Sequence, residues 1–257
     1  RHLERGAPWD ACDAFREAIA QHPGDAELLY WGALAHARAG AAKTAHALLD
    51  RAQAVASPVP GRLADILSLR GRLWKDEFHR AQGSAAAAEL GERARGEYLA
   101  AYRLLQDPYP GINAATLSLL LGDRITATKL AQEIAGKLAA QPTPRTCWDH
   151  ATAGEAALLL GQFDRARQCY SAAYAAAPGD AGSVASMRRQ AGMLARVLPE
   201  AATVLPLLPA PAILAFSGHM IDAPDRPEPR FPAELEPAVA AAIRQHLATL
   251  REPIIYT

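Results

Sequence analysis

"GQFDRARQCYSAAYAAAPGD", residues 161–180, shares a pattern with "DACDAFREAIAQHPGDA", residues 10–26. In each stretch an alanine is followed by an aromatic residue four positions later, an alanine seven positions later and a proline twelve positions later. Positions 0, 4 and 7 lie on one face of a helix. The small side chains allow a neighbouring helix to approach, and the aromatic ring fills the space between them. The pattern predicts a closely packed helix that ends at the proline, with Asp25 or Asp180 capping the next helix.

Weaker copies of this pattern begin at Ala45, Ala94 and Ala127, so that successive copies are 34, 49, 33 and 39 residues apart. A period near 34 residues is that of tetratricopeptide repeats, in which each unit is a pair of helices. The turns between paired helices also share a glycine that suits the left-handed end of a helix. These glycines are Gly40, Gly122 and Gly161.

The repeat predicts a mainly α fold, a tetratricopeptide-like solenoid of α-α hairpins over residues 8–198. The alternative is an irregular all-α bundle, which has the same composition but does not explain the period. We expect Phe15, Tyr98 and Tyr170, which occupy the aromatic position, to be buried between adjacent hairpins. The predicted helices span residues 8–21, 25–39, 42–56, 61–80, 85–105, 111–121, 123–139, 146–160, 163–176 and 180–198.

The composition argues against several classes of partner. The 257 residues include 27 Lys and Arg and 27 Asp and Glu, so charge gives no reason to expect a nucleic-acid or membrane surface. The three cysteines form no CxxC motif, which favours a reducing compartment, the cytoplasm. The chain opens on Arg1, and residues 8–21 read as the second helix of a repeat unit. We therefore expect a fragment of a longer protein.

Two stretches depart from generic repeat sequence, "GRLWKD" at 71–76 and "YPGINAATL" at 109–117. With "CWDHATAGEAALLLGQFDRA" at 147–166 they resemble the TRAFs-binding domain, a tetratricopeptide-type region of apoptosis-signal-regulating MAP kinase kinase kinases that also occurs in bacterial signalling proteins. The resemblance covers roughly residues 10–198. It implies a regulatory scaffold that binds a protein partner or a neighbouring domain without catalysis. The Ala-, Arg- and Gly-rich composition favours a bacterial source.

Four residues of these stretches are candidate partner-binding residues: Arg72, Lys75, Asp76 and Asn113. Arg72 and Asp76 lie four positions apart on one helix face, where an exposed ion pair contributes only about 0.3–0.5 kcal/mol. The pair either is an ordinary solvated pair or anchors a partner. Pro110 and Gly111 are expected to form a turn. Asn113 would then either satisfy free backbone groups in the first helical turn or contact a partner.

After Leu198 the pattern changes. Residues 199–211 read as a proline-rich linker, and residues 212–257 as the truncated start of an α/β domain, with strand, loop, helix and strand in that order. "FSGHMID" at 216–222 resembles the start of SLOG-type Rossmann-like domains, which are predicted nucleotide sensors. The resemblance implies a nucleotide-like ligand once the domain is complete. The candidate ligand-binding residues are Gly218, His219, Asp222 and Arg226.

The sequence contains no HExxH motif, no GxSxG motif and no metal-ligand spacing. We therefore assign no catalytic residue, no metal site and no cofactor. The predicted function is a non-catalytic interaction and regulatory scaffold of a signalling protein. The alternative is the regulatory half of a larger enzyme, a nucleotide cyclase or kinase, whose catalytic domain lies outside this chain.

Overall fold

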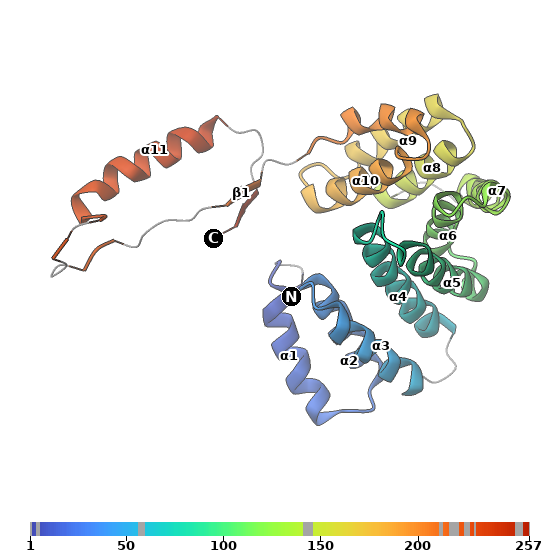
Figure 1. Cartoon of the computed structure of the whole chain (residues 1–257), viewed down its shortest axis with the longest axis horizontal. Coiled ribbons are helices and arrows are strands. Elements are labelled where there is room, and N and C mark those ends of the chain that lie inside the picture. Colours follow the sequence, from blue (N-terminus) through green and yellow to red (C-terminus); the bar gives the residue numbers. More distant parts are fainter. Residues whose placement is uncertain are drawn as a thin grey trace. The chain divides into compact units, whose positions relative to one another are not determined.

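The computed structural model describes residues 2–3, 6–55, 60–140, 146–210, 213–215, 221–223, 227–228, 230–249 and 254–256. Helices dominate these residues, as Figure 1 shows. The elements in chain order are α1 (Pro8–Gln21), α2 (Ala26–Arg38), α3 (Ala42–Val55), α4 (Pro60–Arg80), α5 (Ala87–Leu105), α6 (Pro108–Leu120), α7 (Arg124–Ala140), α8 (Cys147–Leu159), α9 (Phe163–Ala175), α10 (Ala181–Leu194), the 3-10 helix η1 (Pro199–Leu207), β1 (Ile213–Ala215), the 3-10 helix η2 (Ala233–Leu235), α11 (Glu236–Ala248) and β2 (Ile254–Tyr256).

The chain divides into two compact units, residues 1–169 and 170–257, with the boundary inside α9. In the first unit, α2 packs on α3, α4 on α5 and α6 on α7, which makes three helical hairpins. The first helices of neighbouring hairpins also meet, because α2 contacts α4 and α6 contacts α8. The predicted hairpin solenoid is therefore confirmed.

Side chains just before the helices explain where several of them begin. Asp25 accepts hydrogen bonds from the backbone N–H groups of Glu27 at 2.8 Å and Leu28 at 3.1 Å. Asp180 accepts one from the N–H of Ser183 at 3.0 Å. The first N–H groups of a helix have no partner within the helix, so these carboxylates stabilise the helix starts. Both predicted caps are confirmed.

The turns inside the hairpins depend on glycine. Gly40, Gly122 and Gly161 have φ values of 78°, 90° and 71°. This left-handed conformation is costly for residues with a Cβ atom, and it ends one helix so that the next can turn back. The predicted glycine-ended turns are confirmed at all three positions.

The aromatic position of the repeat is buried in two of the three cases. Tyr98 is fully buried and Tyr170 is 1% exposed. The approach to Tyr98 is close, since a Cβ atom at Gly71 would lie 3.0 Å from its ring. Phe15 is only partly buried, so that expectation was wrong. The physical reason is that α1 packs chiefly against one helix, α2, which covers the ring incompletely.

The start of α6 differs from the prediction. The helix begins at Pro108, and Pro110 and Gly111 lie within its first turn instead of forming a turn before it. Proline is tolerated there because the first N–H groups of a helix lack helical partners. Asp107 caps the helix by accepting from the N–H of Tyr109 at 2.8 Å. Gly111 is needed for packing, because a Cβ there would lie 2.8 Å from the ring of Tyr102.

In the second unit, residues 199–207, which lie within the predicted proline-rich linker, form η1. This short helix packs on α10 and buries Ala201 and Val204. Arg188 of α10 donates hydrogen bonds to the carbonyl oxygens of Leu205 and Leu208, both at 2.7 Å. The apolar residues between the prolines therefore pack against α10. The proline content of this stretch did not by itself predict that packing.

Farther along, β1 and β2 pair in parallel, with Ile213 opposite Ile254 and Ala215 opposite Tyr256. A parallel pair requires a crossover connection. The chain between the strands contains α11, which has no buried residue. The division at residues 198, 211 and 257 into array, linker and α/β segment stays a prediction.

Candidate functional site

Three of the four candidate partner-binding residues lie on α4 and the fourth, Asn113, lies on α6. Both are first helices of their hairpins. We call the side of α2, α4 and α6 that carries Tyr30, Arg62, Arg72 and Tyr109 the first-helix face. These helices come from separate repeat units, so the face combines side chains that are distant in sequence.

Lys75 and Asn113 meet across two hairpins. The Lys75 ammonium donates to Oδ1 of Asn113 at 2.6 Å, and Nδ2 of Asn113 donates to the carbonyl oxygen of Tyr109 at 2.9 Å. Asn113 is 5% exposed, so the contact is largely shielded from water. Asn113 thus joins α4 to the beginning of α6, which gives it a structural role within the face.

Arg72 and Asp76 form a looser pair. The Arg72 Nε atom lies 4.0 Å from Oδ2 of Asp76, and about a third of each side chain is exposed, 37% and 34%. An exposed pair of this geometry stabilises the helix weakly. Both groups are therefore accessible to solvent, and a partner could replace this contact with one of its own.

A buried tyrosine supports this part of the face. The Lys75 Nζ atom lies 5.8 Å from the Tyr98 ring, and the Tyr109 ring meets Tyr98 edge-on at 6.1 Å. Burial raises the pKa of Tyr98 well above its usual value of 10.0. The ring is therefore neutral and supports the lysine as an apolar platform, while Tyr109, which is 48% exposed, offers a contact surface.

Arg62 links α4 to α2 at the other end of the face. Its guanidinium lies 4.9 Å from the Tyr30 ring centroid, 3.4 Å from Glu27 and 3.2 Å from Asp65. Burial raises the pKa of Tyr30, with the Asp65 carboxylate adding to the rise and Arg62 opposing it. Burial likewise raises the pKa of Asp65, against the effect of Arg62. Trp31 beside Tyr30 is 39% exposed, which extends the aromatic surface.

Sequence reasoning missed the residues around Arg62, since an arginine in a helix carries no signal until its aromatic neighbour is known. It also missed a buried polar contact between α6 and α8. There the Thr116 hydroxyl donates to Oε1 of Glu155, with Thr116 fully buried and Glu155 6% exposed. A signal existed, because Glu155 is the one charged residue in the apolar run "AGEAALLL" at 153–160.

Of the four candidate ligand-binding residues in the C-terminal segment, the structure describes Asp222. Gly218, His219 and Arg226 lie outside the described residues. Asp222 accepts hydrogen bonds through Oδ2 from the backbone N–H groups of Arg230 at 2.7 Å and Phe231 at 2.6 Å. The carboxylate therefore closes a loop, and a ligand contact by Asp222 stays a prediction.

Within the part of the chain that the structure describes, no group of His, Cys, Asp and Glu side chains has an arrangement that could hold a metal ion. Among the helices of those same residues, none combines the length and apolarity needed to cross a membrane.

Comparisons with known proteins agree with this architecture. The family model described as Tetratricopeptide Repeats-Sensor matches residues 9–118. A thermophilic TPR protein of Thermus thermophilus superposes with a TM-score of 0.54 at 22% identity, over 75% of this chain and 93% of that chain. The APC/C hetero-tetramer Cut9–Hcn1 gives a TM-score of 0.53 at 15% identity, over 80% of this chain but only 38% of that chain. No curated protein matches at a significant level.

At these identities the solved structures establish the fold alone. The family match covers α2 to α6, which carry the first-helix face, and the structural matches extend farther along the hairpins. Together with the repeat spacing and the observed hairpins, these comparisons identify a tetratricopeptide-type repeat domain in this chain.

Proposed function

We propose that the helical array is a non-catalytic scaffold of a cytoplasmic signalling protein, and that it binds a protein partner or a neighbouring domain through the first-helix face. The observation that carries the proposal is the grouping of Tyr30, Arg62, Arg72 and Tyr109 on three first helices. Arg62 contacts Tyr30, and Arg72 and Tyr109 both lie near enough to affect the pKa of Tyr30. Exposed aromatic rings beside guanidinium groups are typical of protein-binding surfaces.

The chemistry of the face supports recognition rather than catalysis. Its acids and bases contact one another, as Arg62 does with Asp65 and Arg72 with Asp76. Such pairs provide charge-assisted contacts that a partner can exchange for its own. The likeness of "GRLWKD" and "YPGINAATL" to the TRAFs-binding domain, and the word Sensor in the description of the matching family, both favour a regulatory role.

The C-terminal segment completes the proposal. A parallel strand pair whose connection contains α11 is the opening arrangement of a Rossmann-like domain. We propose that the complete domain binds a nucleotide-like anion near Gly218, His219, Asp222 and Arg226, and that the array conveys its occupancy to a partner. Calorimetric titration of nucleotides into the full-length protein and its His219→Ala, Arg226→Ala variant tests this step. Equal binding to both proteins would remove it.

Site-directed photo-crosslinking in cells that express the full-length protein tests the scaffold function. A photoreactive residue replaces Tyr109 on the first-helix face or, as a control, Ile125 on α7, which is 85% exposed. We expect one discrete adduct from position 109 that is absent from position 125. Arg72→Glu in the same protein should remove this adduct, because it reverses a charge at the centre of the face.

The folding control is the thermal unfolding curve of the Arg72→Glu protein, which should match that of its parent. The proposal fails if both positions give the same products, or if the adduct at position 109 survives Arg72→Glu. A cross-link to a catalytic domain of the same polypeptide would instead identify the chain as the regulatory half of an enzyme.

A further inference from the structure

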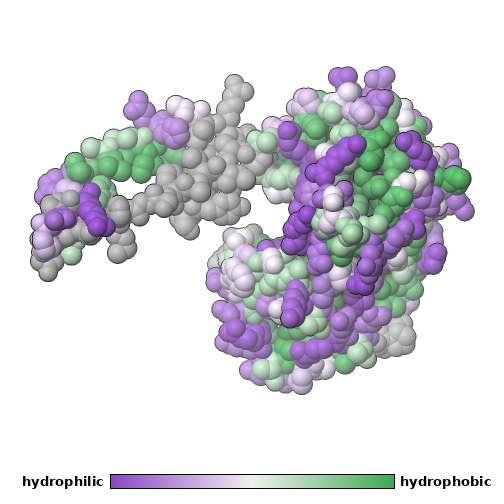
Figure 2. Space-filling model, viewed as in Figure 1, coloured by the Kyte–Doolittle hydropathy of each residue, from purple (hydrophilic) through white to green (hydrophobic). Residues whose placement is uncertain are grey.

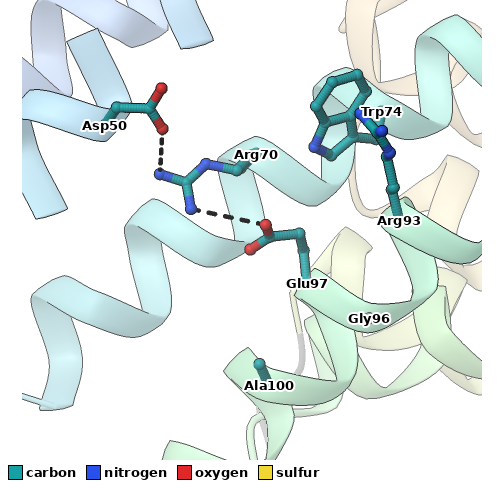
Figure 3. A pocket seen from close by; sticks show the side chains of 7 residues that line it. All are labelled: Asp50, Arg70, Trp74, Arg93, Gly96, Glu97 and Ala100. Carbon is teal, nitrogen blue, oxygen red and sulfur yellow. Dashed lines mark hydrogen bonds and ion pairs between the residues drawn. The ribbon is translucent and has the colours of Figure 1, made fainter. Parts of the chain in front are cut away.

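A groove lies between α3, α4 and α5 (Figure 3). Arg70 and Trp74 are one turn apart on α4 and lie about 160° around the helix from Arg72 and Asp76 respectively. With Asp50 on α3 and four residues of α5 they line a volume of about 500 Å³. The α5 residues are Arg93, Gly96, Glu97 and Ala100.

Arg70 joins the two walls of the groove but does not balance their charge. It donates to Gln53 at 2.7 Å and lies 3.0 Å from Asp50 and 3.6 Å from Glu97. The atoms that meet it are Oδ1 of Asp50 and Oε1 of Glu97. One buried guanidinium thus serves two carboxylates, so this group of charges carries an excess negative charge and has further acceptor oxygens.

The second arginine of the groove is already neutralised. Arg93 lies 2.6 Å from Glu89, and its guanidinium stacks 5.1 Å from the Trp74 ring. On another side the His46 ring lies 4.2 Å from Trp74, and burial lowers the pKa of His46 despite the nearby Glu77 carboxylate. Around Trp74 the neutral histidine therefore leaves the negative charge of Glu77 in place.

The α5 wall is low. A Cβ atom at Gly96 would meet nothing within 4 Å, so packing does not require glycine at this position. One turn later, Ala100 packs against the apolar cluster of Ala64, Leu67 and Ala101. Small residues here leave room for a peptide backbone, with an apolar surface at one end and carboxylates in the middle.

We propose that this groove binds a peptide segment of a partner protein that carries an arginine or lysine beside an apolar residue. The cationic side chain contacts Asp50 and Glu97, and the apolar residue covers Ala100. The charged lining residues are two carboxylates and two guanidinium groups, but Arg93 is paired with Glu89 outside the groove. Only Arg70 therefore remains to balance Asp50 and Glu97, which favours a cationic occupant. The residues of this site differ from those of the first-helix face. Peptide binding here can therefore be tested independently of the proposed scaffold function.

The test is a titration of the full chain with the peptide acetyl-Gly-Leu-Arg-Leu-Gly-amide, followed through the indole N–H signals in NMR spectra. Trp74→Phe identifies the signal of Trp74. The arginine peptide should shift this signal, and the peptide with neutral citrulline in place of arginine should bind at least about tenfold more weakly, since it lacks the charge-assisted contacts.

Two variants locate the site. Asp50→Asn with Glu97→Gln should weaken arginine-peptide binding by at least about tenfold, whereas Asp13→Asn, which removes an exposed carboxylate of α1, should leave it unchanged. Because the double variant could also disturb folding, Gly96→Leu provides a second test. It fills the groove on a helix position with open space, and binding should be lost while thermal stability is retained.

Gly136→Leu on α7 is the matched control, because a Cβ at Gly136 also meets nothing within 4 Å. It should bind the peptide as the unaltered chain does. Equal affinity for the arginine and citrulline peptides would overturn the proposal. So would preferential binding of a glutamate peptide, retained binding by Gly96→Leu, or the absence of any Trp74 shift at the solubility limit of the arginine peptide.

Discussion

Helices α6 and α11 are equal in length but differ completely in burial. Each has 13 residues and a proline in its first turn. In α6 nine residues are buried, from Pro110 to Ser118, whereas α11 has no buried residue. Figure 2 shows hydrophobic side chains on the surface along α11, and Val239 and Ile243 are 40% and 37% exposed.

The difference distinguishes the stability that a helix has on its own from the stability that it gains by packing. A lone helix shorter than about 12–15 residues is marginal in water, so most helices depend on packing of an apolar face. Helix α6 lies in a core with Tyr98, Tyr102 and residues of α7 and α8. Substitutions in that core should therefore affect unfolding of the array strongly, and substitutions on α11 should have little effect on it.

The largest effect is expected at Tyr98, which contributes to the core around α6. Tyr98→Ala should lower the free energy of unfolding by about 3–5 kcal/mol, because it leaves a large cavity among buried residues. Tyr109→Ala is the matched control, since the two rings are in contact but Tyr109 is 48% exposed. Urea denaturation of both variants measures the difference. Similar losses at the two positions would show that the core does not centre on Tyr98.

Tyr98→Phe sharpens this prediction. Within the described residues the buried Tyr98 hydroxyl makes no hydrogen bond of good geometry, although the nearby Tyr109 side chain contributes to the raised pKa of Tyr98. Removal of the hydroxyl should leave stability unchanged or raise it by up to about 1 kcal/mol, because the desolvation cost of an unsatisfied group is relieved. A loss above that size in urea denaturation would mean that the hydroxyl makes a stabilising contact.

Glycines inside helices provide the next comparison. A Cβ at Gly111 of α6 would lie 2.8 Å from the Tyr102 ring and 2.9 Å from Ile134, so Gly111→Ala should destabilise by about 1–3 kcal/mol through overpacking. Gly136→Ala on α7 has open space and should stabilise by about 0.5–1 kcal/mol. Thermal unfolding should shift in opposite directions for the two variants, and a shift of the same sign would contradict the packing described for α6.

Tyr102 gives the same core a pH dependence. Burial and the Glu133 carboxylate raise the pKa of Tyr102 from 10.0 to about 12. The stabilising contribution is fully present below pH 10 and is lost as pH rises through about 12, because the unfolded chain releases this proton first. Stability of the unaltered chain should fall more steeply across this range than that of Tyr102→Phe. Parallel pH profiles from urea denaturation would exclude this contribution.

The smallest effect is expected on α11. Val239→Ala should change the unfolding free energy of the array by less than about 0.5 kcal/mol, since the side chain is 40% exposed and α11 buries none of its residues. In α6, truncation of the buried Ile112 to alanine should cost about 2–5 kcal/mol. A large loss from Val239→Ala would show that α11 packs against another surface in solution.

The sequence by itself determined the helices and their turns. The Ala–aromatic–Ala spacing, the capping residues Asp25 and Asp180, and glycines such as Gly122 are local signals, and each acts within one or two turns of the chain. For this reason all ten predicted helices were confirmed with shifts of only a few residues at most of their ends. Two ends were the main errors. Helix α6 begins at Pro108, before Gly111, because Asp107 caps it, and α10 ends at Leu194 instead of residue 198.

Only the tertiary structure decided which side chains meet. Lys75 and Asn113 are 38 positions apart, and Arg70 lies between carboxylates 20 positions before it and 27 positions after it. Such pairs depend on how successive hairpins stack, which is set by the sum of many small packing contacts rather than by one local pattern. The same dependence explains Phe15: its position in the repeat is that of Tyr98, but its burial depends on how many helices surround it.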